Sequence, residues 1–90
     1  MSNPAYQNVE DVYKAARKIA EDLQKCGQAD AAREITETIG NFWTTSSEAL
    51  GETRLTLLNL RSIVKEHTGA ETLQLLDEAA NGADDLWHGR

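Results

Sequence analysis

Residues that break helices are scarce in this chain, and their positions limit what it can form. The single proline is Pro4, so helix is permitted at every later position. Two of the glycines, Gly27 and Gly69, directly follow long segments of helical periodicity and predict helix C-caps. No segment alternates apolar and polar residues between turn residues, as a half-buried strand would. The sequence therefore predicts an all-α fold.

Apolar residues recur three and four positions apart in four segments, which predict helices at about residues 8–26, 29–42, 46–67 and 70–81. Asn8 is the expected N-cap of the first helix, and a start at Asn3 is the competing boundary. Thr45 and Glu48 have capping-box spacing at the start of the third helix. The dipeptide at positions 81–82 is expected to end the fourth helix early, leaving residues 83–90 as a short turn and tail.

Four helices joined by short connections predict one domain over residues 1–90, an up-down four-helix bundle of two helical hairpins. The predicted core consists of the apolar residues on the main stripes: Val12, Ala16, Ile19, Leu23, Ile35, Ile39, Trp43, Leu50, Leu57, Leu60, Val64, Leu73, Leu76 and Ala80. Other apolar residues lie off these stripes and are expected to complete a homodimer or a partner site: Leu55, Leu58, Ile63 and Leu75.

Composition excludes several classes of protein. The chain has 15 acidic and 9 basic residues and a net charge of −6, which argues against binding a nucleic-acid backbone. Apolar runs are only two or three residues long, so we expect neither a membrane span nor a signal peptide. Cys26 is the single cysteine, which suits a reducing compartment and predicts a cytoplasmic protein. It continues the stripe of the first helix, so we expect it to be buried.

The residues needed for catalysis or metal binding do not converge. The two histidines, His67 and His88, do not have the spacing of a known metal motif, and His88 with Asp84 makes only a two-ligand pair. Adjacent carboxylates, such as Asp77 and Glu78, diverge by about 100° on a helix. We therefore expect no catalytic residue, no cofactor and no metal, and a protein that is not an enzyme.

Charge is unevenly distributed. From Glu66 to Arg90 there are six acidic residues and one basic residue, which predicts either a solvated face or a docking face for a basic protein. Arg54 and Arg61 stand one heptad apart and either pair with acids of a neighbouring helix or mark an interface. The candidate partner-binding residues are Asp77, Glu78, Asp84, Asp85, Arg54, Leu55 and Leu58.

Two families share features with the chain. Acyl carrier proteins are also small, acidic and four-helical, and the segment Ser46-Ser47-Glu48-Ala49-Leu50 is similar to their modified-serine motif. The chain lacks the aspartate before that serine and the leucine after it, which puts modification of Ser46 or Ser47 in doubt. This carrier-like domain is one alternative for the function.

A second resemblance covers residues 9–64. Its motifs are Gly27-x-x-x-x-Ala32-x-x-Ile35, then Thr45-Ser46-Ser47-Glu48-x-Leu50, then Arg54 and Leu57. The pattern resembles small all-helical bacterial proteins of unknown function, although this chain has an extra C-terminal helix. The resemblance implies a bacterial, cytoplasmic, non-enzymatic protein. The predicted function is a protein-protein interaction module of immunity or antitoxin type, and a structural or regulatory homo-oligomer is the other alternative.

Overall fold

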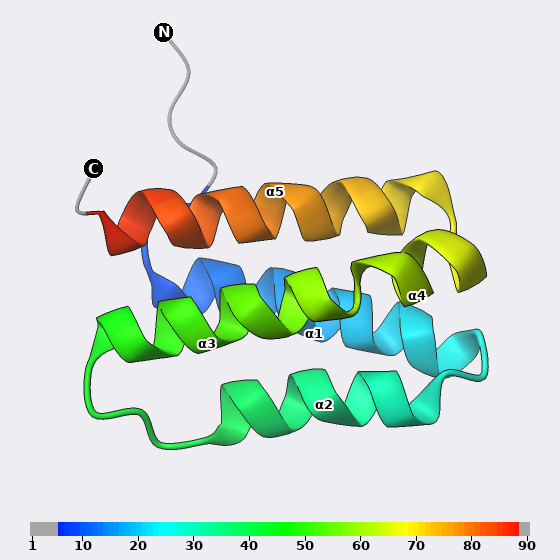
Figure 1. Cartoon of the computed structure of the whole chain (residues 1–90), viewed down its shortest axis with the longest axis horizontal. Coiled ribbons are helices and arrows are strands. Elements are labelled where there is room, and N and C mark those ends of the chain that lie inside the picture. Colours follow the sequence, from blue (N-terminus) through cyan, green and yellow to red (C-terminus); the bar gives the residue numbers. More distant parts are fainter. Residues whose placement is uncertain (1–5, 89–90) are drawn as a thin grey trace, which may run out of the picture.

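The computed structural model describes residues 6–88, and Figure 1 shows them as helices joined by short loops. The five helices are α1 (Val9–Lys25), α2 (Ala29–Gly40), α3 (Ser46–Asn59), α4 (Arg61–His67) and α5 (Ala70–Trp87). No strand occurs between residues 6 and 88, which confirms the all-α prediction. Residues 6–88 form five helices where the sequence predicted four, so the four-helix bundle of two hairpins is not confirmed in that form.

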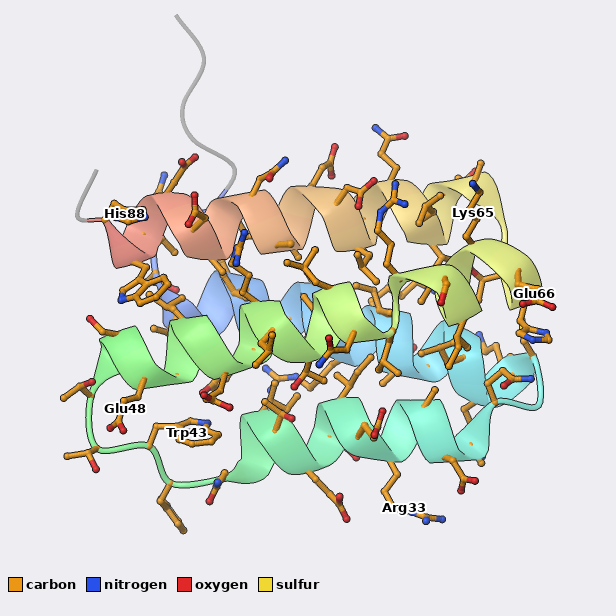
Figure 2. The ribbon with its side chains drawn as sticks, in the orientation of Figure 1. Arg33, Trp43, Glu48, Lys65, Glu66 and His88 are labelled. Atoms are coloured by element: carbon orange, nitrogen blue, oxygen red, sulfur yellow. The ribbon has the colours of Figure 1, made fainter. Side chains whose placement is uncertain are left out.

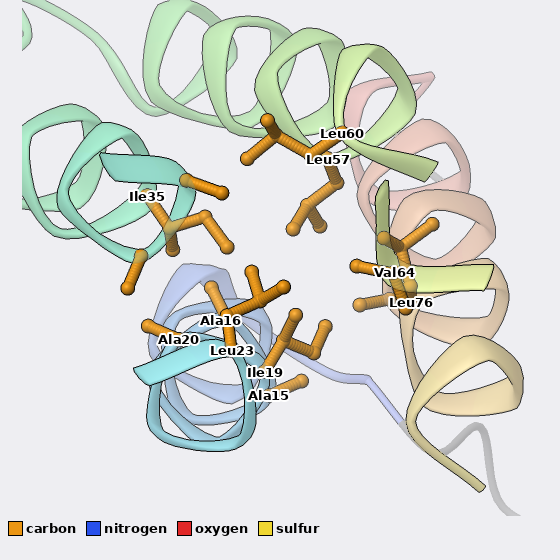
Figure 3. Packing of buried hydrophobic residues seen from close by; sticks show 13 residues of the cluster. Ala15, Ala16, Ile19, Ala20, Leu23, Ile35, Leu57, Leu60, Val64 and Leu76 are labelled. Atoms are coloured by element: carbon orange, nitrogen blue, oxygen red, sulfur yellow. The ribbon is translucent and has the colours of Figure 1, made fainter. Parts of the chain in front are cut away.

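The helices enclose a main core and a smaller one. α1 packs chiefly against α2 and α5, while α3 packs chiefly against α5 and α2. In Figure 1, α5 runs along the top, α2 along the bottom, and α3 lies in front of α1. All five helices supply buried residues to the main cluster, part of which Figure 3 shows from close by. The smaller cluster joins α1, α3 and α5 through Val12, Leu50 and Ala83.

The predicted core residues are buried with three exceptions, which are Ile39, Trp43 and Leu73. These three are only partly buried. α2 ends at Gly40, two residues before the predicted end at residue 42. Trp43 lies in the loop between α2 and α3.

The predicted helix over residues 46–67 is wrong at Leu60, where α3 ends and α4 begins. Leu60 has φ −97° and ψ 1°, which bends the chain there. Its N–H still donates to the Thr56 carbonyl, and its carbonyl accepts from the Val64 N–H, so the backbone hydrogen bonds bridge the bend. Figure 3 shows the consequence: Leu57 and Leu60 lie on one side of the core, and Val64 lies beside Leu76.

The predicted end of the last helix at residue 81 is also wrong, because α5 continues to Trp87. Gly82 is buried inside the helix and packs against Tyr6. A Cβ at position 82 would lie 2.5 Å from Tyr6 Cδ2, which is far too close for a real contact. Glycine therefore allows the ring to approach the helix. Residues 83–87 of the predicted tail belong to α5, and the smaller core includes Ala83.

Of the four predicted helix caps, three are confirmed and one is wrong. Asn8 Oδ1 accepts from the Asp11 N–H, and Thr45 Oγ1 accepts from the Glu48 N–H, both at 3.1 Å, so both N-caps are confirmed. The alternative start at position 3 lies outside the described residues. Gly27 closes α1 with φ +81°, and the Gln28 N–H donates to the Leu23 carbonyl as in a Schellman cap.

Gly69 does not act as the predicted C-cap. Thr68 ends α4 in extended conformation, and Gly69 is the N-cap of α5 with φ −85°. The Val64 carbonyl accepts from both the N–H and the hydroxyl of Thr68, at 2.9 and 2.6 Å. Thr68 thus closes α4 through its own backbone and side chain, with no glycine in the left-handed region.

Two buried threonines should respond oppositely to the same substitution. Thr72 Oγ1 donates to Asp22 Oδ2 at 2.8 Å. Thr53 is only 1% exposed, and its hydroxyl has no hydrogen-bond partner among residues 6–88. We expect Thr53→Val to raise the free energy of unfolding by about 1 kcal/mol, because it removes an unsatisfied buried hydroxyl of nearly the same shape. Thr72→Val should lower it by about the same amount. Urea unfolding followed by circular dichroism measures both, and equal shifts of one sign would contradict this account.

Candidate functional site

The structure separates the four candidate acids into two kinds. Asp77 accepts two hydrogen bonds from Arg61, at 2.8 and 3.0 Å, and Asp84 lies 3.9 Å from Arg54. The prediction that the two arginines pair with acids of a neighbouring helix is therefore confirmed. Glu78 and Asp85 are exposed. The acids of α5 thus do not form one uncompensated docking face, and binding of a partner to them stays a prediction.

Two carboxylates have pKa values below their ordinary range. At Asp22 the largest cause is the hydrogen bond from Lys18, and the hydrogen bond from Thr72 acts in the same direction against partial burial. At Asp77 the largest cause is the hydrogen bond from Arg61. Because Asp22 belongs to α1 and Thr72 to α5, the first of these carboxylates also ties two helices together.

Acid should therefore destabilise the fold in a defined range of pH. A carboxyl group whose pKa is lower in the folded state favours folding above its unfolded pKa, about 3.9, and loses this contribution as the pH falls through the folded value. We expect the urea midpoint to fall as the pH drops below about 4. In an Asp22→Asn/Asp77→Asn double variant the fall should be smaller. An equal fall in both proteins would assign the acid sensitivity to other carboxylates.

Large apolar side chains are exposed where α3 meets the end of α5. Leu55 is 51% exposed and Trp87 is 47% exposed, and both line a hollow of about 430 Å³. Gly51 lies beneath the indole, since a Cβ there would be 4.0 Å from Trp87 Cη2. The lining residues of this hollow, named here the α3–α5 hollow, are Ser47, Glu48, Gly51, Glu52, Arg54, Leu55 and Trp87.

The structure therefore brings three of the sequence candidates to one place. Arg54 and Leu55 line the α3–α5 hollow, and Asp84 contacts Arg54 beside it. Leu58, one turn further along α3, is 38% exposed. Sequence reasoning did not name Trp87 as a candidate, because residues 83–90 were expected to form a turn and tail, whereas α5 continues to Trp87 and carries it to this hollow.

The end of α5 adds a histidine to this region. His88 stacks on Trp87 with ring centroids 5.6 Å apart and planes 26° apart, and its Nε2 lies 3.3 Å from Asp84 Oδ1. The two potential ligands of the sequence analysis are thus neighbours. Between residues 6 and 88, however, no group of three or more histidine, cysteine or acidic residues is arranged to hold a metal ion.

A second, polar hollow of about 330 Å³ lies between α2 and α3 and is named here the α2–α3 groove. Its lining residues are Glu34, Glu37, Thr38, Asn41, Trp43, Glu52, Thr56 and Asn59. The hydroxyls of Thr38 and Thr56 are 2.9 Å apart and join the two helices. Trp43 Nε1 donates to the Thr38 carbonyl at 2.9 Å, which holds the indole at the end of the groove. Figure 2 shows Trp43 between the end of α2 and the start of α3.

Cys26 and Phe42 lie apart from these two hollows. Cys26 is exposed and not buried as predicted, because α1 ends at Lys25 and the cysteine follows it at the cap. It lines another hollow, between the end of α1 and the start of α5, together with Lys18 and Asp22, which pair with each other. Phe42 is fully exposed in the loop before Trp43.

The serines of the carrier-like alternative open α3. Ser46 and Ser47 are both exposed in its first turn, directly after the Thr45 cap. Ser47 also lines the α3–α5 hollow. Exposure is compatible with modification, and the carrier alternative remains a hypothesis.

Comparison of the chain with protein-family models, with curated proteins and with solved structures finds no significant match. The resemblance of residues 9–64 to small bacterial helical proteins therefore remains a hypothesis. Among residues 6–88, none of the helices has both the length and the apolar character that crossing a bilayer requires.

Proposed function

We propose that this protein acts without catalysing a reaction, as an interaction module that binds another protein through the α3–α5 hollow. The observation that carries the proposal is the shared exposure of Leu55 and Trp87, which come from different helices and line one hollow. Exposed apolar groups gathered in one place lower the free energy when a partner covers them. Tryptophan is also enriched among the residues that dominate binding energy at interfaces.

The surroundings of the hollow suit an interface. Arg54 and the acids Glu48 and Glu52 surround the apolar residues, which is the usual arrangement of an apolar centre and a polar rim. A module of this kind needs a stable surface and no active site, as in immunity proteins and antitoxins, which inhibit by covering another protein. Bacterial origin and a cytoplasmic location belong to the same proposal.

The experiment is affinity capture from the native cell extract, followed by binding measurements on the recovered protein. Leu55→Ser should weaken binding by at least about tenfold, because it removes an anchor from the centre of the contact. Phe42→Ser is the matched control, since it removes an exposed apolar side chain outside the hollow, and should change affinity less than about twofold. A recovered partner that tolerates Leu55→Ser would overturn the proposal.

The same surface also fits the alternative of a homo-oligomer in which α3 is the interface. Light scattering separates the two, since a homo-oligomer dissociates on Leu55→Ser and a monomer keeps its mass.

A further inference from the structure

The two hollows described above adjoin on α3, and Glu52 lines both of them. The α3–α5 hollow is largely apolar, whereas the α2–α3 groove has three glutamates and the indole of Trp43. Glu52 and Leu55 are three residues apart on α3, so they lie about one turn from each other on one side of the helix. A single segment of a partner is therefore able to contact both hollows at once.

The joint surface carries uncompensated negative charge. Glu34, Glu37, Glu48 and Glu52 are all exposed, and within residues 6–88 none of them takes part in an ion pair. Arg54 is the basic residue in the lining of the two hollows, and Asp84 already lies 3.9 Å from it. This differs from α5, where arginines of α3 and α4 contact two of the acids. A cationic partner would gain attraction here that α5 does not offer.

Trp43 adds a second preference for a cation. Its N–H donates to the Thr38 carbonyl, so the ring is held in place at the end of the groove. Figure 2 shows it at the same end of the molecule as Glu48. An indole attracts a lysine or arginine side chain through its π system, and nearby carboxylates strengthen that preference.

Resting on the proposed function, we infer that the partner presents a cationic amphipathic helix to this surface. One of its apolar side chains occupies the α3–α5 hollow, against Leu55 and Trp87. A lysine or arginine three or four positions away reaches Glu52 and enters the α2–α3 groove. This spacing places the two side chains on one face of the partner helix, matching the spacing of Leu55 and Glu52 on α3.

The test uses a synthetic helical peptide of about 14 residues with leucine on one face and lysine on the other, and the same peptide with glutamate in place of lysine. Tryptophan emission reports binding in Trp87→Phe, which leaves Trp43, and in Trp43→Phe, which leaves Trp87. We expect the lysine peptide to shift the emission of both tryptophans and the glutamate peptide to shift neither.

Matched variants separate a specific site from general attraction to an acidic protein. The double variant Glu37→Gln/Glu52→Gln should weaken binding of the lysine peptide by at least about fivefold. The control Glu71→Gln/Glu78→Gln removes the same amount of charge from α5 and should change the affinity less than about twofold. Circular dichroism checks that each variant is folded. If the two double variants weakened binding of the lysine peptide equally, or if that peptide did not bind, the inference would be overturned.

The outcomes distinguish this inference from the function on which it rests. One outcome is that the native partner requires Leu55 and yet binds the Glu37→Gln/Glu52→Gln variant with the affinity it has for the unaltered protein. That result would support the proposed binding surface and contradict the cationic helix. If the glutamate peptide binds as tightly as the lysine peptide, the inference that the partner helix is cationic is wrong. If light scattering shows a dimer that Leu55→Ser dissociates, the occupant is a second copy of this chain and the inference fails.

Discussion

Leu57→Ala is expected to lower the free energy of unfolding by about 3–4 kcal/mol, the range found when a fully buried leucine is truncated. Leu57 is completely buried in the main core, where it faces residues of the neighbouring helices (Figure 3). The loss combines the transfer free energy of the removed atoms with the cavity left behind. It is a large part of the total stability that a domain of this size usually has. Urea unfolding followed by circular dichroism measures it.

The neighbouring leucines of α3 provide the control. Leu55 and Leu58 undergo the same change on the same helix, so helix propensity changes equally in all three variants. Both are exposed, and their truncation should cost less than about 1 kcal/mol. If Leu55→Ala were as costly as Leu57→Ala, Leu55 would be a structural residue, and the α3–α5 hollow would lose its proposed role.

These leucines also show what apolar spacing predicts well. Leu57 lies on the stripe that continues to Leu60, and both were predicted to be buried, while Leu55 and Leu58 lie off it and are exposed. Apolar residues spaced three and four positions apart mark the one face of a helix that is buried. This face can therefore be predicted from the sequence without knowing which helices pack against it. Ile63 and Leu75 also lie off the stripes but are partly buried against the main core; this depends on those neighbours and was not predictable in this way.

The bend at Leu60 was hidden for a related reason. Positions 57, 60 and 64 keep helical spacing across the bend, and no proline or glycine marks it. The ion pair of Arg61 with Asp77 and the contact of Val64 with the core hold the new direction, and both need residues that are distant in sequence. Pairing of Asp77 and Asp84 on α5 with Arg61 and Arg54 likewise depends on helices that precede them in the chain.

Gly82 is the position where local sequence was most misleading, and its substitution should have the second large effect. Alanine is favoured over glycine inside a helix by about 1 kcal/mol, so propensity alone predicts stabilisation by Gly82→Ala. The added Cβ would lie 2.5, 2.6 and 2.9 Å from Cδ2, Cγ and Cβ of Tyr6. The last of these atoms is next to the backbone, so the whole residue must move. Tyr6 packs against both core clusters, and we expect a net loss of about 2 kcal/mol.

Gly51→Ala is the matched control, because Gly51 is also inside a helix but its added Cβ meets only Trp87 Cη2 at 4.0 Å, an ordinary contact. This variant should gain up to about 1 kcal/mol from helix propensity. The two substitutions are therefore expected to move the thermal midpoint in opposite directions. A Tyr6→Ala/Gly82→Ala double variant should be no less stable than Tyr6→Ala alone, since the clash has gone and the propensity gain remains. If Gly82→Ala stabilised the protein as Gly51→Ala does, the close packing of Tyr6 against α5 would be wrong.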